Sequence, residues 1–216
     1  VGLSGKRFII KKVDTTTSAV TIITHEADDY IDDADYSSTG FKLFAPYDVV
    51  ELVCHLDEDG SNYEWHIASQ ILSPHHITAR QDSAQTIAGA FEVITLDATV
   101  GTPKGISFTN GSDLVTIARA GRYIVSCKLA VASADGDQLF VAIGKNQTGT
   151  PDGSTFLAGT FVAGHANGAY NYIGSTTTVD LAVGDTLKLI GWNTSSVSTY
   201  VGSARQKSEI SVTEVI

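Results

Sequence analysis

The apolar pattern constrains this chain most, because apolar residues either alternate with period two or cluster in short runs. Residues 8–13 and the β-branched run 19–24 are examples. Alternation suits a strand, whose successive side chains point to opposite faces, and β-branched residues favour strands. Clusters of Gly, Asn, Asp and Ser separate the runs, and no long segment has the 3.6-residue period of a helix. We therefore expect an all-β protein.

Two groups of strands are predicted, separated by a segment in which the pattern fades. Pro74 and the polar residues 79–83 lie in this segment, which indicates a linker. We expect a small N-terminal β module over 1–68, a linker over 69–88 and a β sandwich over 89–216. The predicted strands are 8–13, 19–24, 41–44, 49–55 and 63–67, followed by 91–96, 114–117, 122–131, 139–144, 155–161, 170–181, 186–192 and 209–215.

Charge separates the same two modules. The formal net charge is -10. Residues 1–68 hold 13 acids and 5 bases, whereas residues 69–216 hold 11 acids and 9 bases. This balance argues against a nucleic-acid partner, since binding to nucleic acid depends on Lys and Arg neutralising phosphates. No run of about 18 apolar residues occurs, so we expect no membrane insertion.

The first dozen residues depart from the acidic character of the module. Lys6, Arg7, Lys11 and Lys12 lie there without any acid. One interpretation is a surface that contacts another protein. The alternative is an ordinary edge strand whose basic side chains discourage aggregation.

The second module resembles the C1q/TNF-like jelly roll over about residues 88–216. The segment 120–125 (AGRYIV) is similar to the strand that follows a glycine in that family, and 181–189 (LAVGDTLKL) is similar to its L-x-x-G-D-x-L-x-L hairpin. The chain also ends on a predicted strand, where the last strand of the family would lie. Gly121 and Gly184 are expected to have positive φ in tight turns.

This resemblance implies a homotrimer with an apolar three-fold interface. Tyr123, Phe140, Tyr172 and Trp192 are then the candidate interface aromatics. The alternative for each is core packing within one subunit.

The first module is similar to small β units of phage tail fibres and virion surface proteins. Together the modules resemble trimeric surface proteins of tailed phages, which implies a location on the virion surface, on the head in preference to the tail. We expect a trimeric decoration protein, a head spike that binds the major capsid protein and stabilises the shell. The alternative is the receptor-binding tip of a tail fibre, with Tyr170 and Tyr200 contacting a host surface glycan or protein.

Catalytic, cofactor and metal chemistry find little support in the sequence. Cys54 and Cys127 lie in apolar strand segments, which favours buried thiols over reactive ones. The acidic cluster 28–35 is interpreted as a solvated loop, with a calcium site as the alternative. His75 and His76 are interpreted as linker residues, with a metal site as the alternative. We expect no enzyme, no cofactor and no resident metal.

Overall fold

The computed structural model divides the chain into two units, Val1–Ser73 and Pro74–Ile216. It describes residues 4–13, 18–24, 30–32, 34–35, 40–44, 47–56, 63–87, 89–111, 113–132, 136–167, 170–201 and 207–215. The boundary falls within the predicted linker, but residues 69–88 are not a linker as a whole. Three strands occupy parts of this range: the end of β7 (Tyr63–Ile71), β8 (His76–Arg80) and β9 (Thr86–Ile87). The linker prediction was therefore wrong for most of its length.

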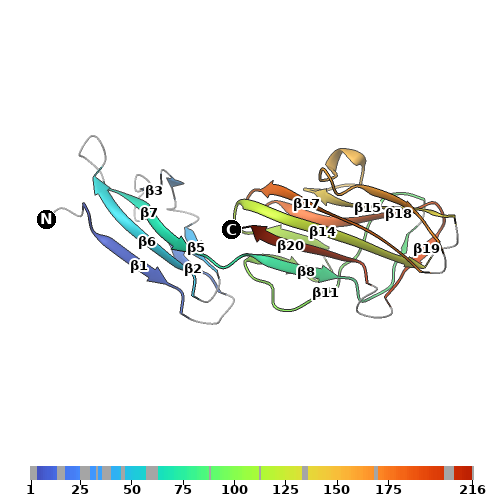
Figure 1. Ribbon diagram of the computed structural model, residues 1–216, viewed down its shortest axis with the longest axis horizontal. Coiled ribbons are helices and arrows are strands. Elements are labelled where there is room, and N and C mark those ends of the chain that lie inside the picture. Colours follow the sequence, from blue (N-terminus) through green and yellow to red (C-terminus); the bar gives the residue numbers. More distant parts are fainter. Residues whose placement is uncertain are drawn as a thin grey trace. The chain divides into compact units, whose positions relative to one another are not determined.

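The N-terminal unit contains a five-stranded sheet in the order β1-β6-β7-β3-β4 and a separate two-stranded antiparallel sheet of β2 and β5. Figure 1 shows β1, β6 and β7 side by side. Because the apolar runs at β3 and β4 are short, only β1, β6 and β7 pair over most of their length among the described residues. The bounds are β1 Arg7–Lys11, β2 Val20–Ile22, β3 Tyr30–Ile31, β4 Ala34–Asp35, β5 Phe41–Leu43 and β6 Val49–Leu56.

The C-terminal unit is a sandwich of two sheets. One has the path β11-β8-β20-β14 with β17 on the other side of β14, and the other has the order β12-β13-β18-β15-β16. The chain passes between the sheets from β13 to β14, from β14 to β15, from β16 to β17 and from β17 to β18. Connections that cross between two antiparallel sheets in this way are typical of a double-sheet jelly roll. The expected fold class, a small β module followed by a jelly-roll sandwich, is confirmed.

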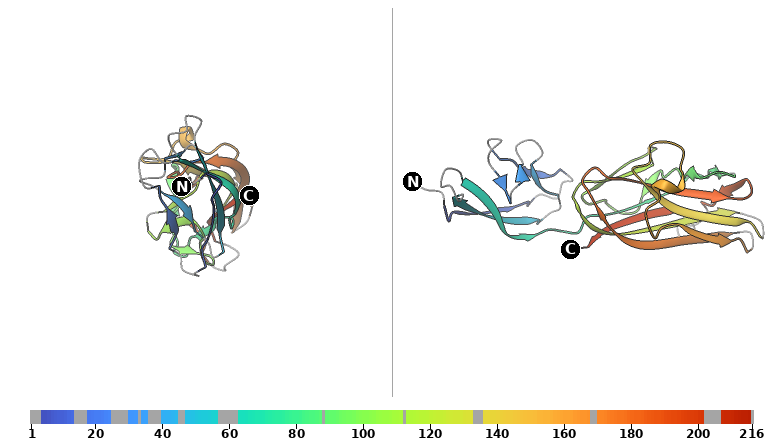
Figure 2. Two further views of the ribbon diagram at one scale, coloured as in Figure 1. Left: turned by 90° about the vertical axis from the view of Figure 1, so that its left-hand side faces the viewer. Right: turned by 90° about the horizontal axis from the view of Figure 1, so that it is seen from above.

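Strands of this unit run along its length in both Figure 1 and the view from above in Figure 2. Two short pairings extend the sheets, β10 on β18 and the β9–β19 pair on β14. The bounds are β10 Glu92–Val93, β11 Ala98–Thr99, β12 Ile106–Thr109, β13 Leu114–Ile117, β14 Gly121–Ala132, β15 Gln138–Lys145, β16 Val162–His165, β17 Asn171–Leu181, β18 Thr186–Asn193, β19 Val197–Thr199 and β20 Glu209–Val215.

The predicted strand over 155–161 is the main error within this unit. A 3₁₀ turn occupies Gly153–Thr155, where the Asp152 side chain accepts a hydrogen bond from the Ser154 N–H. This cap holds the backbone in a turn despite the apolar residues that follow. Only an isolated bridge between Phe156 and Gly144 forms before β16 begins at Val162.

Alternation along β14 and β18 builds the core of the jelly roll. Tyr123, Val125 and Leu129 of β14 are fully buried, as are Leu187 and Leu189 of β18. Each fully buried aliphatic side chain stabilises the fold by about 1.5–3 kcal/mol relative to exposure. These two strands supply part of a core cluster to which β8, β13, β15 and β20 also contribute buried side chains.

A buried ion pair joins β20 to the segment before β14, and a hydrogen bond from His75 adds the start of this unit. The Arg119 guanidinium donates to both carboxylate oxygens of Glu214, at 2.8 Å for its Nε. The His75 N–H donates to the same carboxylate at 3.0 Å, and the Glu214 N–H donates to the His75 carbonyl at 2.8 Å. The Tyr123 hydroxyl donates to the Arg119 carbonyl at 2.7 Å. These hydrogen bonds therefore hold β20 against the start of the unit and against the segment that leads into β14.

The two glycines expected in positive-φ turns differ. Gly184 has φ 85° in the turn between β17 and β18, as predicted. Gly121 instead begins β14 and is absent from the positive-φ glycines of the described chain, so that expectation was wrong. A Cβ there would lie 3.1 Å from the Glu214 carboxylate. The lack of a side chain at Gly121 therefore allows the Glu214 carboxylate to lie close to the backbone of β14.

Gly105 tests the packing around His75. A Cβ at Gly105, where φ is 61°, would lie 2.2 Å from the buried His75 ring. We expect Gly105→Ala to lower the free energy of unfolding by about 2–4 kcal/mol, since it adds a clash to left-handed backbone strain. Gly101→Ala is the matched control, because φ is 75° there and nothing lies within 4 Å. Equal losses for both variants in chemical denaturation would contradict this account.

Acid should destabilise the jelly-roll unit through Glu214. Burial raises the pKa of Glu214. The hydrogen bonds from Arg119 and His75 and the charges of these residues lower it by more, so the net pKa lies below the ordinary value. A lowered pKa stabilises the fold above the unfolded-state pKa, and this contribution is lost as the pH falls through the folded-state pKa. We therefore expect unfolding free energy to fall below about pH 4.5.

The slope of stability against pH distinguishes this cause from general acid effects. Glu214→Gln should flatten the slope below pH 4.5, because the titrating carboxylate is gone. Glu209→Gln is the control, since it removes the partly exposed carboxylate that pairs with Lys128 at 3.0 Å. A Glu214→Gln variant that keeps the full wild-type slope would refute the assignment.

Candidate binding surfaces

Three of the four basic residues near the N-terminus are exposed along β1. Lys6 directly precedes the strand, and Arg7 and Lys11 begin and end it. Arg7 donates to Glu51 at 2.9 Å, and the Lys11 ammonium lies 5.0 Å from the centre of the Tyr47 ring. The side chains are thus held in place and accessible, which suits either interpretation of the basic segment.

The fourth basic residue, Lys12, does not suit a contact surface. Its side chain is fully buried. The Lys12 N–H donates to the Asp48 carbonyl at 3.0 Å, and the Lys12 carbonyl accepts from the Tyr47 N–H at 2.7 Å. These bonds draw the end of β1 against the start of β6 and take the lysine out of solvent. The prediction that Lys12 contacts another protein was therefore wrong.

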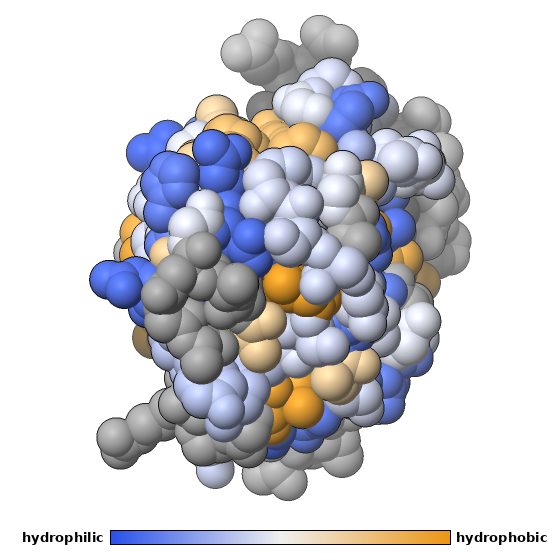
Figure 3. Space-filling view, turned by 90° about the vertical axis from the view of Figure 1, so that its right-hand side faces the viewer, coloured by the Kyte–Doolittle hydropathy of each residue, from blue (hydrophilic) through white to orange (hydrophobic). Residues whose placement is uncertain are grey.

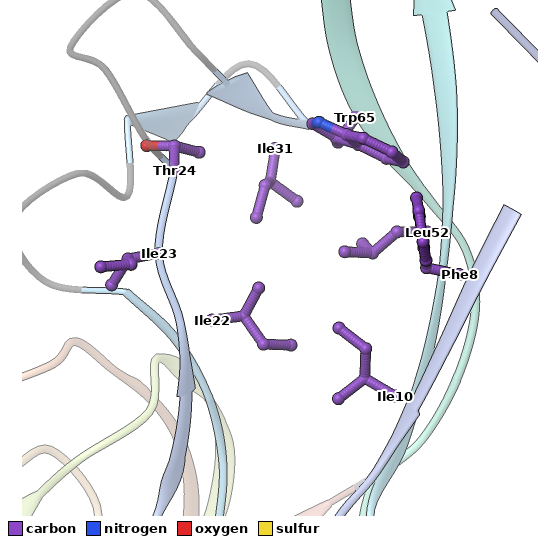
Figure 4. Close-up of a pocket in the computed structure, with 8 residues that line it drawn as sticks. All are labelled: Phe8, Ile10, Ile22, Ile23, Thr24, Ile31, Leu52 and Trp65. Carbon is purple, nitrogen blue, oxygen red and sulfur yellow. The ribbon is translucent and has the colours of Figure 1, made fainter. Parts of the chain in front are cut away.

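An apolar cavity of about 300 Å³ lies in the N-terminal unit (Figure 4). Figure 4 shows aliphatic side chains converging on it from both sides, with Trp65 at one edge and Ile10 of β1 at another. The rings of Phe8 and Trp65 are 5.3 Å apart. The cavity is lined by Phe8, Ile10, Ile22, Ile23, Thr24, Ile31, Leu52 and Trp65.

The cavity is open to apolar contact from outside. Phe8 is 51% exposed and Ile23 is 63% exposed at its rim. A cavity of about half this volume, lined by aliphatic and aromatic residues, holds benzene in an engineered protein. The cavity therefore has the lining and volume to accept an apolar side chain of a partner. Sequence alternation predicted strands here but gave no sign that their side chains leave a gap.

A cluster of five aromatic side chains covers part of the outer face of the β12–β16 sheet. Phe140 and Trp192 lie 4.7 Å apart, Phe91 and Phe156 lie 5.1 Å apart, and Phe140 and Phe161 lie 5.4 Å apart. Phe161 is 47% exposed, and the other four are partly buried. A cluster of this kind on a surface marks an interaction site more often than a scattered residue does.

Register explains the position of this aromatic cluster. Phe140 of β15 pairs with Trp192 of β18, so their side chains share one face. Leu139 and Val141 are buried in the core, which directs Phe140 to the outer face. Only Phe140 and Trp192 were singled out from the sequence. The sequence did contain a signal for such a cluster. It is an aromatic residue at an outward position of a strand whose inward positions are already apolar.

The four candidate interface aromatics do not lie together. Tyr123 is fully buried in the core, so the alternative of core packing holds for this residue and it is no interface aromatic. Phe140 and Trp192 belong to the aromatic cluster on one sheet. Tyr172 pairs with Ala130 on the outer face of the other sheet and is 44% exposed. The sandwich thus has one exposed aromatic feature on each outer face.

The two tyrosines proposed to contact a ligand do lie together. The rings of Tyr170 and Tyr200 are 4.5 Å apart, and Tyr170 is 55% exposed. Tyr200 directly follows β19, which lies at the end of the unit seen in Figure 3. Hydrophobic residues form only small separate patches on the described part of this end (Figure 3). A tyrosine pair on a polar surface can stack on a flat or ring-shaped ligand.

Among the described residues, no group of three or more metal-ligating side chains is present. Both cysteines are buried free thiols, as predicted. Burial raises the pKa of each, although the charge of Lys6 partly offsets this for Cys54 and hydrogen bonds to Ser175 do so for Cys127. The described chain also contains no helix long and apolar enough to cross a membrane.

The acidic cluster lies mostly outside the described residues. Asp28, Asp29 and Asp33 are not described. The Asp32 carboxylate accepts from the Ile67 N–H at 2.9 Å, which supports the parallel pairing of β3 with β7. His75 is fully buried and His76 begins β8, so neither belongs to a linker.

No protein-family model matches this chain, and no curated protein matches it. Solved structures similar to part of it include murine APRIL at pH 8.0, with 11% identity, and Eiger TNF from S. frugiperda, with 14% identity. The similarity to APRIL covers 66% of this chain and 100% of the APRIL chain, with a TM-score of 0.48. The similarity to Eiger TNF covers 66% of this chain and 92% of the Eiger chain, with a TM-score of 0.46.

Proposed function

We propose that this chain is a non-enzymatic structural protein that attaches to a larger assembly through its N-terminal unit and presents its jelly-roll unit. The specific proposal is that the protein is a trimeric decoration protein of a phage head and that its attachment partner is the major capsid protein. The observation that carries the proposal is the open apolar cavity beside an exposed basic strand, within a module that is otherwise acidic.

The physical basis is the difference between the two cores. Among the described residues, the jelly roll buries two dozen core side chains in one cluster, whereas the core cluster of the N-terminal unit has four fully or nearly fully buried members. Phe8, Ile9 and Ile23 are each more than half exposed on the smaller unit. A partner that covers them gains hydrophobic free energy of about 25 cal/mol per Å². The N-terminal unit is thus the part of the chain that gains most from attachment.

Trimer formation is the second part of the proposal. A cyclic trimer joins two different patches of each subunit, unlike a two-fold dimer, which joins one patch to itself. The aromatic cluster on one sheet and the exposed Tyr172 on the outer face of the other are two different surfaces that could meet in this way. Ile124, on the same face as Tyr172, is 44% exposed.

A receptor-binding tip of a tail fibre is the second candidate function. The observation that favours it is the Tyr170–Tyr200 pair, since paired aromatic rings on a polar surface are suited to stacking on a sugar ring of a host glycan. In this case the jelly roll is the recognition unit, and the N-terminal unit joins it to the fibre.

Location in the particle distinguishes the two functions. A reconstruction of the virion should show this protein distributed over the head, with density for the N-terminal unit against the capsid shell. Density confined to the tail tip, together with competition by the purified chain for cell binding, would contradict decoration and favour the receptor-binding function.

The trimer is tested by mass in solution. Light scattering of the full chain should give three times the 22.8-kDa mass of one chain. Phe161→Glu should lower this mass, because it places a charge in the aromatic cluster. Val183→Glu is the control, since Val183 is 66% exposed in a turn outside the cluster. A wild-type mass of one chain would refute the trimer.

A further inference from the structure

The strand β1 has an unpaired edge. It is the first strand in the order β1-β6-β7-β3-β4, and among the described residues no strand pairs with its outer side. The pairing of β1 with β6 is antiparallel, with Phe8 opposite Leu52 and Ile10 opposite Val50. An open edge of this kind is a template for another strand.

Hydrogen bonding fixes which backbone groups of β1 remain available. Lys6 accepts from the Cys54 N–H at 2.9 Å and Lys12 donates to Asp48 at 3.0 Å, so even-numbered residues bond to β6. In an antiparallel ladder, directly opposite pairs alternate between bonded and non-bonded. The N–H and C=O groups of Arg7, Ile9 and Lys11 therefore point to the open edge.

Side chains of β1 divide between two faces. Phe8 and Ile10 line the apolar cavity, whereas Arg7, Ile9 and Lys11 lie on the opposite face (Figure 4 shows the cavity side). A strand added beside β1 would lie about 4.8 Å away and would follow the same alternation. Its side chains next to Phe8 and Ile10 would reach the rim of the cavity, and those next to Arg7 and Lys11 would meet positive charge.

We propose that β1 is completed by an extended segment of a partner protein, whose five paired residues follow the pattern acidic, apolar, β-branched, apolar, acidic. The inference deepens the proposed attachment function and rests on it. Main-chain bonds to Arg7, Ile9 and Lys11 hold the segment. Its apolar residues contact the rim of the cavity, and its acidic residues lie opposite the basic ends of β1.

A second copy of this chain is a poorer occupant of the same edge. Antiparallel pairing of β1 with its own copy, centred on Ile9, places Arg7 of each chain opposite Lys11 of the other. Like charges directly opposite each other destabilise a sheet. The basic ends of β1 thus select an acidic segment over self-pairing.

The test measures binding of two short peptides to the full chain by isothermal titration calorimetry. The first peptide is Thr-Glu-Leu-Val-Leu-Glu-Thr, and the second replaces both glutamates by lysine. We expect the acidic peptide to bind about tenfold more tightly than the basic one, because charge is the difference between them. Failure of the acidic peptide to bind, or equal binding of the two peptides, would overturn the inference.

Variants of β1 separate main-chain pairing from side-chain contact. Ile9→Pro removes an N–H that points to the open edge and leaves the bonds to β6, so it should weaken the acidic peptide about tenfold. Ile9→Ala is the matched control, because it keeps that N–H and should bind almost as wild type. Equal effects of the two variants would contradict strand addition.

Charge exchange keeps the test valid if the proline variant does not fold. Lys11→Glu should reduce binding of the acidic peptide and improve binding of the basic one, and an unchanged preference would overturn the inference. Self-association of the wild-type chain that Ile9→Pro abolishes would show a second copy on this edge and would also overturn it. Head location in the virion is measured separately, so failure of peptide binding leaves the attachment function standing.

Discussion

The pairing of β14 with neighbours on both sides is the constraint on which the jelly-roll unit depends. This strand bonds to β17 from Gly121 to Val131 and to β20 from Arg122 to Lys128. Its inward side chains then meet those of β18 in the core. The strand β20 lies between β14 and β8, and its Glu214 carboxylate accepts from Arg119, just before β14, and from the His75 N–H, near the start of the unit.

The N-terminal unit is built on the opposite principle. Its sheet is narrow, the outer edge of β1 is unpaired among the described residues, and side chains of β1, β2 and β6 line an apolar cavity. A void forfeits the dispersion contacts of the residues that line it. The same gap is useful where a partner supplies the missing atoms. An open unit and a closed unit in one chain fit attachment by the first and display by the second.

Sequence alternation predicted the long strands well, since β13 and β20 have the predicted bounds and β14 differs by one residue at each end. It missed β8, although Ile77 and Ala79 alternate with polar neighbours, because Pro74 and the paired histidines suggested a linker. It also grouped Lys12 with Lys6, Arg7 and Lys11 as a basic residue available for contact. Burial of a lysine depends on how the end of β1 meets Asp48 and Tyr47, and this is a tertiary relation that a local pattern does not contain.

The candidate surfaces could be predicted only in part for the same reason. Tyr170 and Tyr200 were selected separately, and only the fold brings their rings together. Phe91, Phe156 and Phe161 join Phe140 and Trp192 through the register of four segments that are distant in sequence. The cavity has no sequence signature at all, because a gap between side chains follows from the distance between strands.

Residue-resolved amide hydrogen exchange of the free chain tests the open edge of β1 most directly. The account predicts slow exchange for the N–H groups of Phe8 and Ile10, which bond to β6, and fast exchange for those of Arg7, Ile9 and Lys11. Comparable protection of all five N–H groups in the free chain would contradict it, because the edge would then already be paired.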